Sequence, residues 1–300
     1  IGAVPAGEYV VTLRLERAHQ PGEEQQQLEH PYLVVTDEYL ESPRARVWQG
    51  RCCGPALTGL YLEMIDLAHV ELAERLLELF TRKEAEGVEV RLIYDSIGSY
   101  SLSPSYLRRL RRAGIEVYAF LPFRLGKFMT SVNYRNHRKI IVVDGEIAFT
   151  GGINISDKYL KGDKYLGMWH DMHLMVKGQA AHQLDAVFIN DWELVSGKKL
   201  EIKAPAYTAP PGDKRVQILA TGPDDDYPLM EQLYFSLINS ARNHLYITNP
   251  YIIPSHAIMT ALHTAALSGV DVRLMVSAQA DSAVVTWCVR SYFQRFLKAG

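Results

Sequence analysis

Six residues between positions 137 and 154 bring together groups that suit chemistry on a phosphate diester. His137 and Lys139 stand just before a β-branched run at residues 140–143, which is typical of a buried strand. In an extended chain, residues two apart point to the same face, so the imidazole and the ammonium project together. A neutral histidine can attack phosphorus or transfer protons near pH 7, and a lysine offers a point charge to phosphoryl oxygens.

The residues that follow add oxygen-binding groups to this pair. Asp144 ends the first strand, and a second strand at 146–150 leads to Gly151, Gly152 and Asn154. Paired glycines let a backbone come close to a ligand, and an asparagine amide with backbone N–H groups can hold oxygens whose charge grows in a transition state. We expect no metal, because no second histidine or carboxylate stands at ligand spacing, and we expect no cofactor.

This pattern resembles the HKD signature of the phospholipase D superfamily, which reads His-x-Lys, four residues, Asp, six residues, Gly-Gly, x, Asn. The matching residues are His137, Lys139, Asp144, Gly151, Gly152 and Asn154. The resemblance implies that His137 is the nucleophile, that Lys139 and Asn154 hold phosphate oxygens beside the two glycines, and that Asp144 supports the pair. It also implies an α/β fold of two pseudo-repeated units, each with a mixed sheet flanked by helices.

Length and composition agree with an α/β chain that has a substantial core. The chain has 300 residues, of which 48% are hydrophobic, and a net charge of −2, so no overall basic character predicts nucleic-acid binding. The three cysteines do not suggest a disulfide framework, and a reducing compartment is the simpler interpretation. No run is long enough to span a bilayer, and no signal-peptide pattern is present.

The order of predicted elements places the signature within the first of two units. Strands and helices alternate between residues 60 and 120, which favours an α/β sheet with ligands at the carboxyl ends of its strands. We predict a poorly defined segment at 1–58, a first unit at 59–197, a proline-rich linker at 198–214 and a partial second unit at 215–300.

An internal repeat supports the second unit. Residues 87–93 (GVEVRLI) and 269–275 (GVDVRLM) share five of seven positions at a spacing of 182 residues. Because His137 follows the first copy, a second H-x-K is expected within about 10 to 25 residues beyond position 300. We therefore expect the chain to be truncated before a second HKD motif, and thus to hold half of an active site.

Three other features admit two interpretations each. The arginines at 108, 109, 111 and 112 fit a solvated helix face better than a surface for anionic lipid. The mixed apolar and basic residues at 121–135 suggest an interfacial lipid-entry loop rather than a packed loop. Asp171 and His173 fit the polar face of a strand beside the site better than an acid–base or metal pair.

Within the superfamily, the chain resembles the bacterial cardiolipin synthases over roughly residues 60–300. The segments that carry this resemblance are YDSIGS at 94–99, RRAGIEVYAFLP at 111–122, the signature itself, WHDMH at 169–173, F-x-x-D-W at 188–192 and ITNPYIIP at 247–254. The resemblance implies transfer of a phosphatidyl group between two phosphatidylglycerol molecules through a phosphohistidine. It implies anionic phospholipid and a membrane surface as partners, at the bacterial inner membrane, peripheral or anchored by segments outside this chain.

Other functions stay open at this point. One alternative is a phospholipase D-type phosphodiesterase that hydrolyses phospholipids. Another is a catalytically incomplete fragment that acts only as a membrane-binding module. A nuclease, which single-motif relatives complete by dimerising, is disfavoured by the near-neutral charge, whereas a homodimer of this chain is left open.

Overall fold

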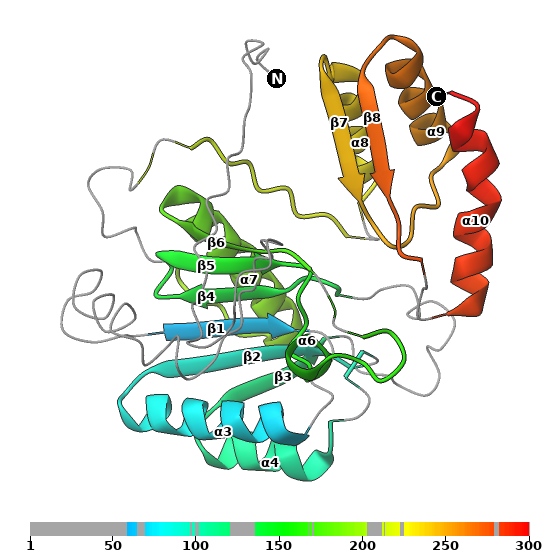
Figure 1. Cartoon of the computed structure of the whole chain (residues 1–300). Coiled ribbons are helices and arrows are strands. Elements are labelled where there is room, and N and C mark those ends of the chain that lie inside the picture. The colour runs from blue at the N-terminus through cyan, green and yellow to red at the C-terminus, as the bar shows by residue number, and fades with distance from the viewer. Residues whose placement is uncertain are drawn as a thin grey trace, which may run out of the picture. The chain divides into compact units, whose positions relative to one another are not determined.

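The computed structural model describes most of the chain beyond position 58 (Figure 1). The described residues are 59–64, 70–96, 98–99, 102–120, 136–167, 169, 171–202, 212, 214–222, 225–278 and 282–299. The predictions for residues 1–58 and for the loop at 121–135 therefore fall outside the described residues. The chain forms two compact units, Ile1–Ala220 and Thr221–Gly300, and the predicted domain boundaries stay predictions.

The first unit is built on a six-stranded mixed sheet with the order β3-β2-β1-β4-β5-β6. Its strands are β1 (Gly59–Met64), β2 (Glu89–Asp95), β3 (Glu116–Phe120), β4 (Ile140–Val143), β5 (Ile147–Gly151) and β6 (His173–Lys177). The first three are parallel, whereas β4 is antiparallel to β1, β5 to β4 and β6 to β5. Consequently one edge of the sheet, here named the polar edge, holds the ends of β1, β2, β3 and β5. The same edge holds the starts of β4 and β6.

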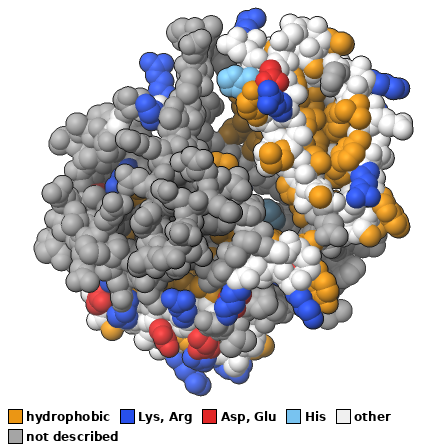
Figure 2. Space-filling view, viewed as in Figure 1, with side chains coloured by type: hydrophobic (Ala, Val, Ile, Leu, Met, Phe, Trp, Pro, Cys, Tyr) orange, Lys and Arg blue, Asp and Glu red, His pale blue; other side chains and the backbone are white. Residues whose placement is uncertain are grey.

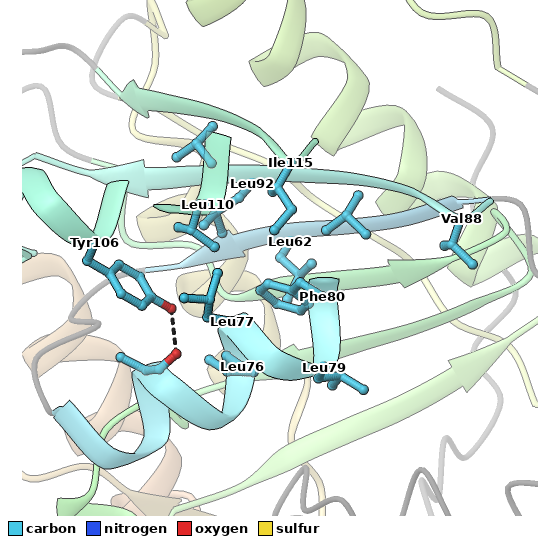
Figure 3. Packing of buried hydrophobic residues seen from close by; sticks show 13 residues of the cluster. Leu62, Leu76, Leu77, Leu79, Phe80, Val88, Leu92, Tyr106, Leu110 and Ile115 are labelled. Carbon is cyan, nitrogen blue, oxygen red and sulfur yellow. Dashed lines mark hydrogen bonds between the residues drawn. The ribbon is translucent and has the colours of Figure 1, made fainter. Parts of the chain in front are cut away.

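Helices cover both faces of this sheet, which confirms the predicted α/β class (Figure 1). On one face, α3 (Val70–Ala85) and α4 (Pro104–Arg112) pack their apolar stripes against β1, β2 and β3. Leu76, Leu79 and Phe80 of α3 are buried, as their helical spacing predicts. The Tyr106 hydroxyl of α4 donates to the Ala73 carbonyl of α3 at 2.7 Å, so the buried phenol is satisfied (Figure 3).

The opposite face is covered by α7 (Gln179–Ser196). The spacing of Leu184, Phe188 and Trp192 predicts a helix at 182–192, and α7 extends beyond that range at both ends. Phe188 and Trp192 of this helix are fully buried, and the Phe188 ring stacks on Tyr61 of β1 with centroids 5.0 Å apart. The helix ends at Gly197, whose left-handed backbone (φ 70°) suits glycine. Because α7 packs against both β1 and β4, it links the parallel half of the sheet to the antiparallel half.

Two predicted strands differ from the structure. Residues 216–220 form no strand, because nothing among the described residues pairs with them. The sequence WHDMHLMV at 169–176 predicts a strand, but β6 begins only at His173. The polar residues at 158–167 predict a loop, but they include the short helix α6 (Lys158–Lys161). These local patterns were too short to fix element boundaries.

The second unit repeats the frame of the first. Its elements are α8 (Leu229–Ser240), β7 (His244–Thr248), α9 (His256–Leu267), β8 (Asp271–Met275) and α10 (Ala283–Leu297). Strands β7 and β8 are parallel, like β1 and β2. Leu60 pairs with Val90 in the first unit and Leu245 with Val272 in the second, so the repeat seen in the sequence extends to strand register.

One side-chain pair shows how the two units differ. Arg91 lies over the Tyr61 ring and Arg273 over the Tyr246 ring, each at 5.2 Å from the centroid. In the first unit α7 covers the tyrosine of this pair, whereas in the second Tyr246 is 57% exposed. Exposed hydrophobic side chains also gather over the second unit (Figure 2).

Asp144 fastens the turn between β4 and β5 to the first strand of the sheet. Its backbone N–H donates to the Gly59 carbonyl at 3.0 Å, and its Oδ1 accepts the Gly59 N–H at 2.8 Å. Asp144 is the non-glycine residue with a positive φ (54°) within the described residues, a conformation that aspartate tolerates. It lies at the end of β4 opposite the polar edge, about 16 Å along the strand from Lys139.

This geometry predicts a structural effect of substitution. Asp144→Ala should lower the free energy of unfolding by about 1–2 kcal/mol, because the buried Gly59 N–H loses its acceptor. Asp144→Asn keeps an oxygen acceptor and tolerates the same backbone conformation, so it should cost much less. Urea unfolding of the three proteins measures the difference, and equal stability of wild type and Asp144→Ala would contradict the assignment.

Candidate active site

The polar edge collects the predicted site residues except Asp144. His137 and Lys139 precede β4, Gly151 ends β5, and Gly152 and Asn154 follow it. Asp95 ends β2 at the same edge and is buried, and its Oδ1 accepts the Gly98 N–H at 2.7 Å. The loop after β2 thus lies where the sequence predicted ligand-binding groups.

Residues 136–139 alternate between two sets of contacts. Asn136 and Arg138 face α7, where both bind one carboxylate oxygen of Asp191. The amide Nδ2 of Asn136 lies 3.2 Å from Asp191 Oδ2, and Nη1 of Arg138 lies 2.5 Å from the same atom. Asn136 Oδ1 also accepts the Arg138 N–H at 2.9 Å, so the ring of bonds closes around His137. The backbone beside the nucleophile candidate is therefore held from both sides.

The other two side chains of this segment meet each other. Lys139 Nζ donates to the His137 carbonyl at 2.9 Å and lies 3.1 Å from His137 Nδ1. Lys139 is 7% exposed, whereas His137 is exposed. The ammonium is therefore held at the base of the site and the imidazole at its rim.

The surroundings keep both basic groups less protonated than usual. Although His137 lies at the rim of the site, partial desolvation of its ring, followed by the charge of Lys139, lowers the pKa of His137, and Asp95 partly opposes this shift. Burial lowers the pKa of Lys139 to about 8, and the charge of Asp171 opposes it. At pH 7 the imidazole is therefore mostly neutral, as nucleophilic attack requires, while the ammonium remains mostly charged.

Gly151 and Gly152 make close contacts with the start of β6. A Cβ on Gly152 would lie 2.1 Å from Asp171 Oδ1, and one on Gly151 would lie 2.4 Å from the Met172 carbonyl oxygen. The glycines therefore let residues 171–173 approach the end of β5, and their contact with substrate stays a prediction.

Asp171 and His173 lie beside the site. This position agrees with the interpretation preferred from the sequence, in which they belong to a polar face next to the site. His173 pairs with Gly151 across β5 and β6. Burial lowers the pKa of His173 to about 4, with Lys139 adding to the effect, so its ring is neutral at physiological pH. Within the described residues, no three His, Cys, Asp or Glu side chains are grouped so that they could hold a metal ion.

Asn154 supplies an amide at the same edge. Its side chain is half-buried, and its Oδ1 meets no hydrogen-bond donor among the described residues. The neighbouring Ser156 is 2% exposed, and its hydroxyl likewise has no partner there. The amide can therefore turn either its oxygen or its nitrogen toward a bound group; its predicted contact with phosphate oxygens stays a prediction.

The arginine cluster of α4 lies away from this site. Arg111 Nη2 donates to the Val117 carbonyl at 3.2 Å, near the start of β3 and hence near the edge opposite the polar edge. Arg109 forms a two-fold contact with Glu74 at 2.6 Å for each bond. The cluster is exposed, which favours the solvated-face interpretation.

The comparisons with known proteins agree with this geometry. The sheet, its flanking helices and the H-x-K segment at the polar edge define a phospholipase D-like α/β unit. The chain belongs to the family described as cardiolipin synthase, PLD-like domain, whose model matches residues 61–192 and 234–300.

Individual relatives extend this match. The chain is 42% identical over 246 residues to a cardiolipin synthase of Geobacillus thermodenitrificans, covering 80% of this chain and 49% of the relative. It is 42% identical over 244 residues to that of Halalkalibacterium halodurans, covering 80% and 48%. The chain thus spans about half the length of these relatives.

A solved structure shares the fold. The phosphatidylserine synthase of Haemophilus influenzae superposes with a TM-score of 0.57 at 16% identity, covering 81% of this chain and 64% of that structure. At this identity the likeness concerns the fold alone. Within the described residues, no helix combines the length and the apolar character needed to cross a membrane.

Asp191 is the site residue that sequence reasoning missed. It stands in the F-x-x-D-W segment, whose aromatic residues are in the core, but nothing in the sequence connects it with position 137, some 54 residues earlier. The alternation of Asn136 and Arg138 with His137 and Lys139 indicates that some polar group must meet the other face of this segment, but it does not identify Asp191 as that group.

Substitution of Asp191 should therefore release the segment around His137. In Asp191→Ala, we expect the His137 ring to sample several orientations, because Asn136 and Arg138 lose their common acceptor. Nitrogen-detected NMR of the imidazole should show a changed tautomer balance and pKa for His137, with little change in the signals of His263 in the second unit. Asp191→Glu should restore part of the wild-type signal, and an unchanged His137 signal in Asp191→Ala would contradict the prediction.

Proposed function

We propose that the protein is a phosphatidyltransferase that makes cardiolipin and glycerol from two phosphatidylglycerol molecules. The observation that carries the proposal is a neutral, exposed His137 held against the buried ammonium of Lys139, in a chain of the cardiolipin synthase family. The proposal also takes an anionic phospholipid and a membrane surface as its partners. We also propose a location at the bacterial inner membrane, because the relatives named cardiolipin synthase come from bacteria and the proposed substrate is a membrane lipid.

In the proposed first step, Nε2 of His137 attacks the phosphorus of one phosphatidylglycerol. The bond from phosphorus to the headgroup glycerol oxygen breaks, and that oxygen takes a proton and leaves as glycerol. A phosphohistidine remains, while Lys139 and the amide of Asn154 hold the phosphoryl oxygens. Attack through Nε2 needs the ring proton on Nδ1, so the contact between Nδ1 and Lys139 Nζ must give way as Lys139 turns to the phosphate.

In the proposed second step, a headgroup hydroxyl of the second phosphatidylglycerol attacks the phosphohistidine. The hydroxyl loses its proton to a base, the phosphorus–nitrogen bond breaks, and cardiolipin and free His137 result. Both steps need a second acid–base group. The repeated β-α-β-α frame of the second unit supports a second H-x-K segment as that group in the whole protein.

The substrate stays attached to its bilayer throughout this scheme. Each buried CH₂ contributes about 0.8 kcal/mol, so two acyl chains of roughly 15 CH₂ groups hold a lipid in the membrane by more than about 20 kcal/mol. The polar edge must therefore meet the membrane surface, and water must be kept from the phosphohistidine while the second lipid arrives.

Lipid analysis tests the proposal. The natural full-length protein in phosphatidylglycerol vesicles should form cardiolipin and glycerol, and His137→Ala should reduce the rate at least about a thousandfold. His263→Ala removes a half-buried histidine of the second unit, whose Nε2 lies 2.8 Å from the Arg295 carbonyl oxygen, and should leave the rate unchanged. Mass spectrometry of the lipids gives the readout.

The products separate the alternatives. Phosphatidic acid without cardiolipin would overturn the transferase and leave a phospholipase D-type phosphodiesterase. Vesicle binding without any lipid conversion would leave a membrane-binding module. A phosphate trapped on a histidine by acid quench, and absent from His137→Ala, would support the covalent step.

The pKa shifts predict a bell-shaped pH dependence of kcat/KM. Activity should rise as pH passes upward through the pKa of His137, which lies below 6.5, because the neutral ring is the nucleophile. It should fall as pH passes upward through about 8, where Lys139 loses its charge. In Lys139→Arg the alkaline fall should vanish, because arginine stays protonated, and an unchanged fall would contradict this assignment.

A further inference from the structure

The connection between β5 and β6 carries a stiff turn at residues 163–167, here named the Tyr165 turn. The Asp163 N–H donates to the Gly167 carbonyl at 2.7 Å, and the Gly167 N–H donates to the Asp163 carbonyl at 2.9 Å. Asp163 Oδ1 also accepts the N–H groups of Tyr165 at 2.8 Å and Leu166 at 3.1 Å. The carboxylate is thus used to hold the turn in one shape.

The turn displays an aromatic side chain and a cation together. Tyr165 is 82% exposed, more than any other large hydrophobic side chain among the described residues. Lys164 Nζ lies 5.7 Å from the centroid of its ring. A tyrosine beside a lysine suits the headgroup layer of a membrane, where an amphipathic ring and a long cationic side chain both find favourable surroundings.

The base of the connection is fixed to the wall of the candidate active site. The Tyr159 hydroxyl of α6 donates to Asp171 Oδ2 at 3.3 Å and lies 3.4 Å from the Gly152 carbonyl oxygen. The Tyr159 ring also meets Trp169 edge to face at 5.4 Å, and Lys158 Nζ lies 5.2 Å from the Trp169 ring. Because Asp171 acts electrostatically on Lys139, the Tyr165 turn is tied to the site that would hold the phosphate.

We propose that the Tyr165 turn is a membrane-contact element that sets the polar edge on an anionic bilayer, with Tyr165 in the interface and Lys164 beside the headgroups. This inference rests on the proposed function, since a phospholipid substrate obliges the polar edge to meet the bilayer. A protein partner would need a wider apolar surface, whereas among the described residues of this connection the other strongly exposed large apolar side chain is Met172 at 56%.

Vesicle co-sedimentation of the 300-residue chain tests the contact without any need for turnover. With vesicles of phosphatidylglycerol and phosphatidylcholine, Tyr165→Ser should weaken partition about three- to tenfold, because the interfacial ring is lost. Tyr165→Trp should bind at least as well as wild type. Because Tyr165 is exposed, we expect both variants to fold like the wild type. Circular dichroism of the variants checks this.

A matched pair of charge reversals tests the orientation. Lys164→Glu should weaken partition onto phosphatidylglycerol vesicles roughly fivefold or more, and the loss should shrink as salt is added. Arg112→Glu makes the same charge change near the opposite edge of the sheet and should bind like wild type. Equal losses for the two variants would overturn the orientation.

The outcomes separate this inference from the proposed function. Binding by Tyr165→Ser at the wild-type level, or no binding by the wild type, would overturn the membrane contact whether or not cardiolipin forms. Weakened binding by Tyr165→Ser, together with no lipid product from the natural full-length protein, would overturn the transferase and leave the contact standing.

Discussion

The alternation of side chains at residues 136–139 is the constraint on which the candidate site depends. Two of the four side chains bind Asp191 on α7, and the other two face the polar edge. Because the four share one stretch of backbone, the bonds that fix Asn136 and Arg138 also fix His137 and Lys139. The positions of the His137 and Lys139 side chains are therefore fixed by contacts on the opposite face of the segment, which takes no part in the chemistry.

A second constraint is the burial of a lysine. An ammonium in the protein interior is costly unless it is paired, and the hydrogen bonds described for Lys139 go to His137 rather than to a carboxylate. The charge of Lys139 is therefore only partly compensated. The carboxylate of Asp171 raises the pKa of Lys139, but burial lowers it by more. An incoming anion would complete the compensation, so the same arrangement that weakens the resting site favours a phosphate in it.

Much of the fold and part of the candidate site could be predicted from the sequence. Physical reasons explain which predictions succeeded and which failed. The helical spacing of Leu76, Leu79 and Phe80 and the repeat at residues 87–93 and 269–275 predicted elements correctly, because local periodicity reports which face is buried. The H-x-K spacing likewise placed His137 and Lys139 side by side. The role of Asp191 could not be predicted, since its contact with Asn136 bridges residues that no local pattern relates.

The glycines illustrate an intermediate case. Their type and spacing predicted a close approach of the backbone to a ligand, and that contact stays a prediction; the structure shows that a protein group lies close to Gly152. The sequence could not tell which group approaches, and among the described residues it is the Asp171 side chain. A pattern thus revealed the steric requirement but not the partner that imposes it.

The shared register of the two units has a consequence for strand pairing. In the first unit β1 is paired along both sides, by β2 and by β4, whereas among the described residues β7 is paired only by β8. A strand with one unpaired side offers a row of backbone donors and acceptors to any extended segment, and its exposed Tyr246 adds apolar surface. An extended segment laid antiparallel along this side of β7 would therefore pair there as β4 pairs with β1 in the first unit.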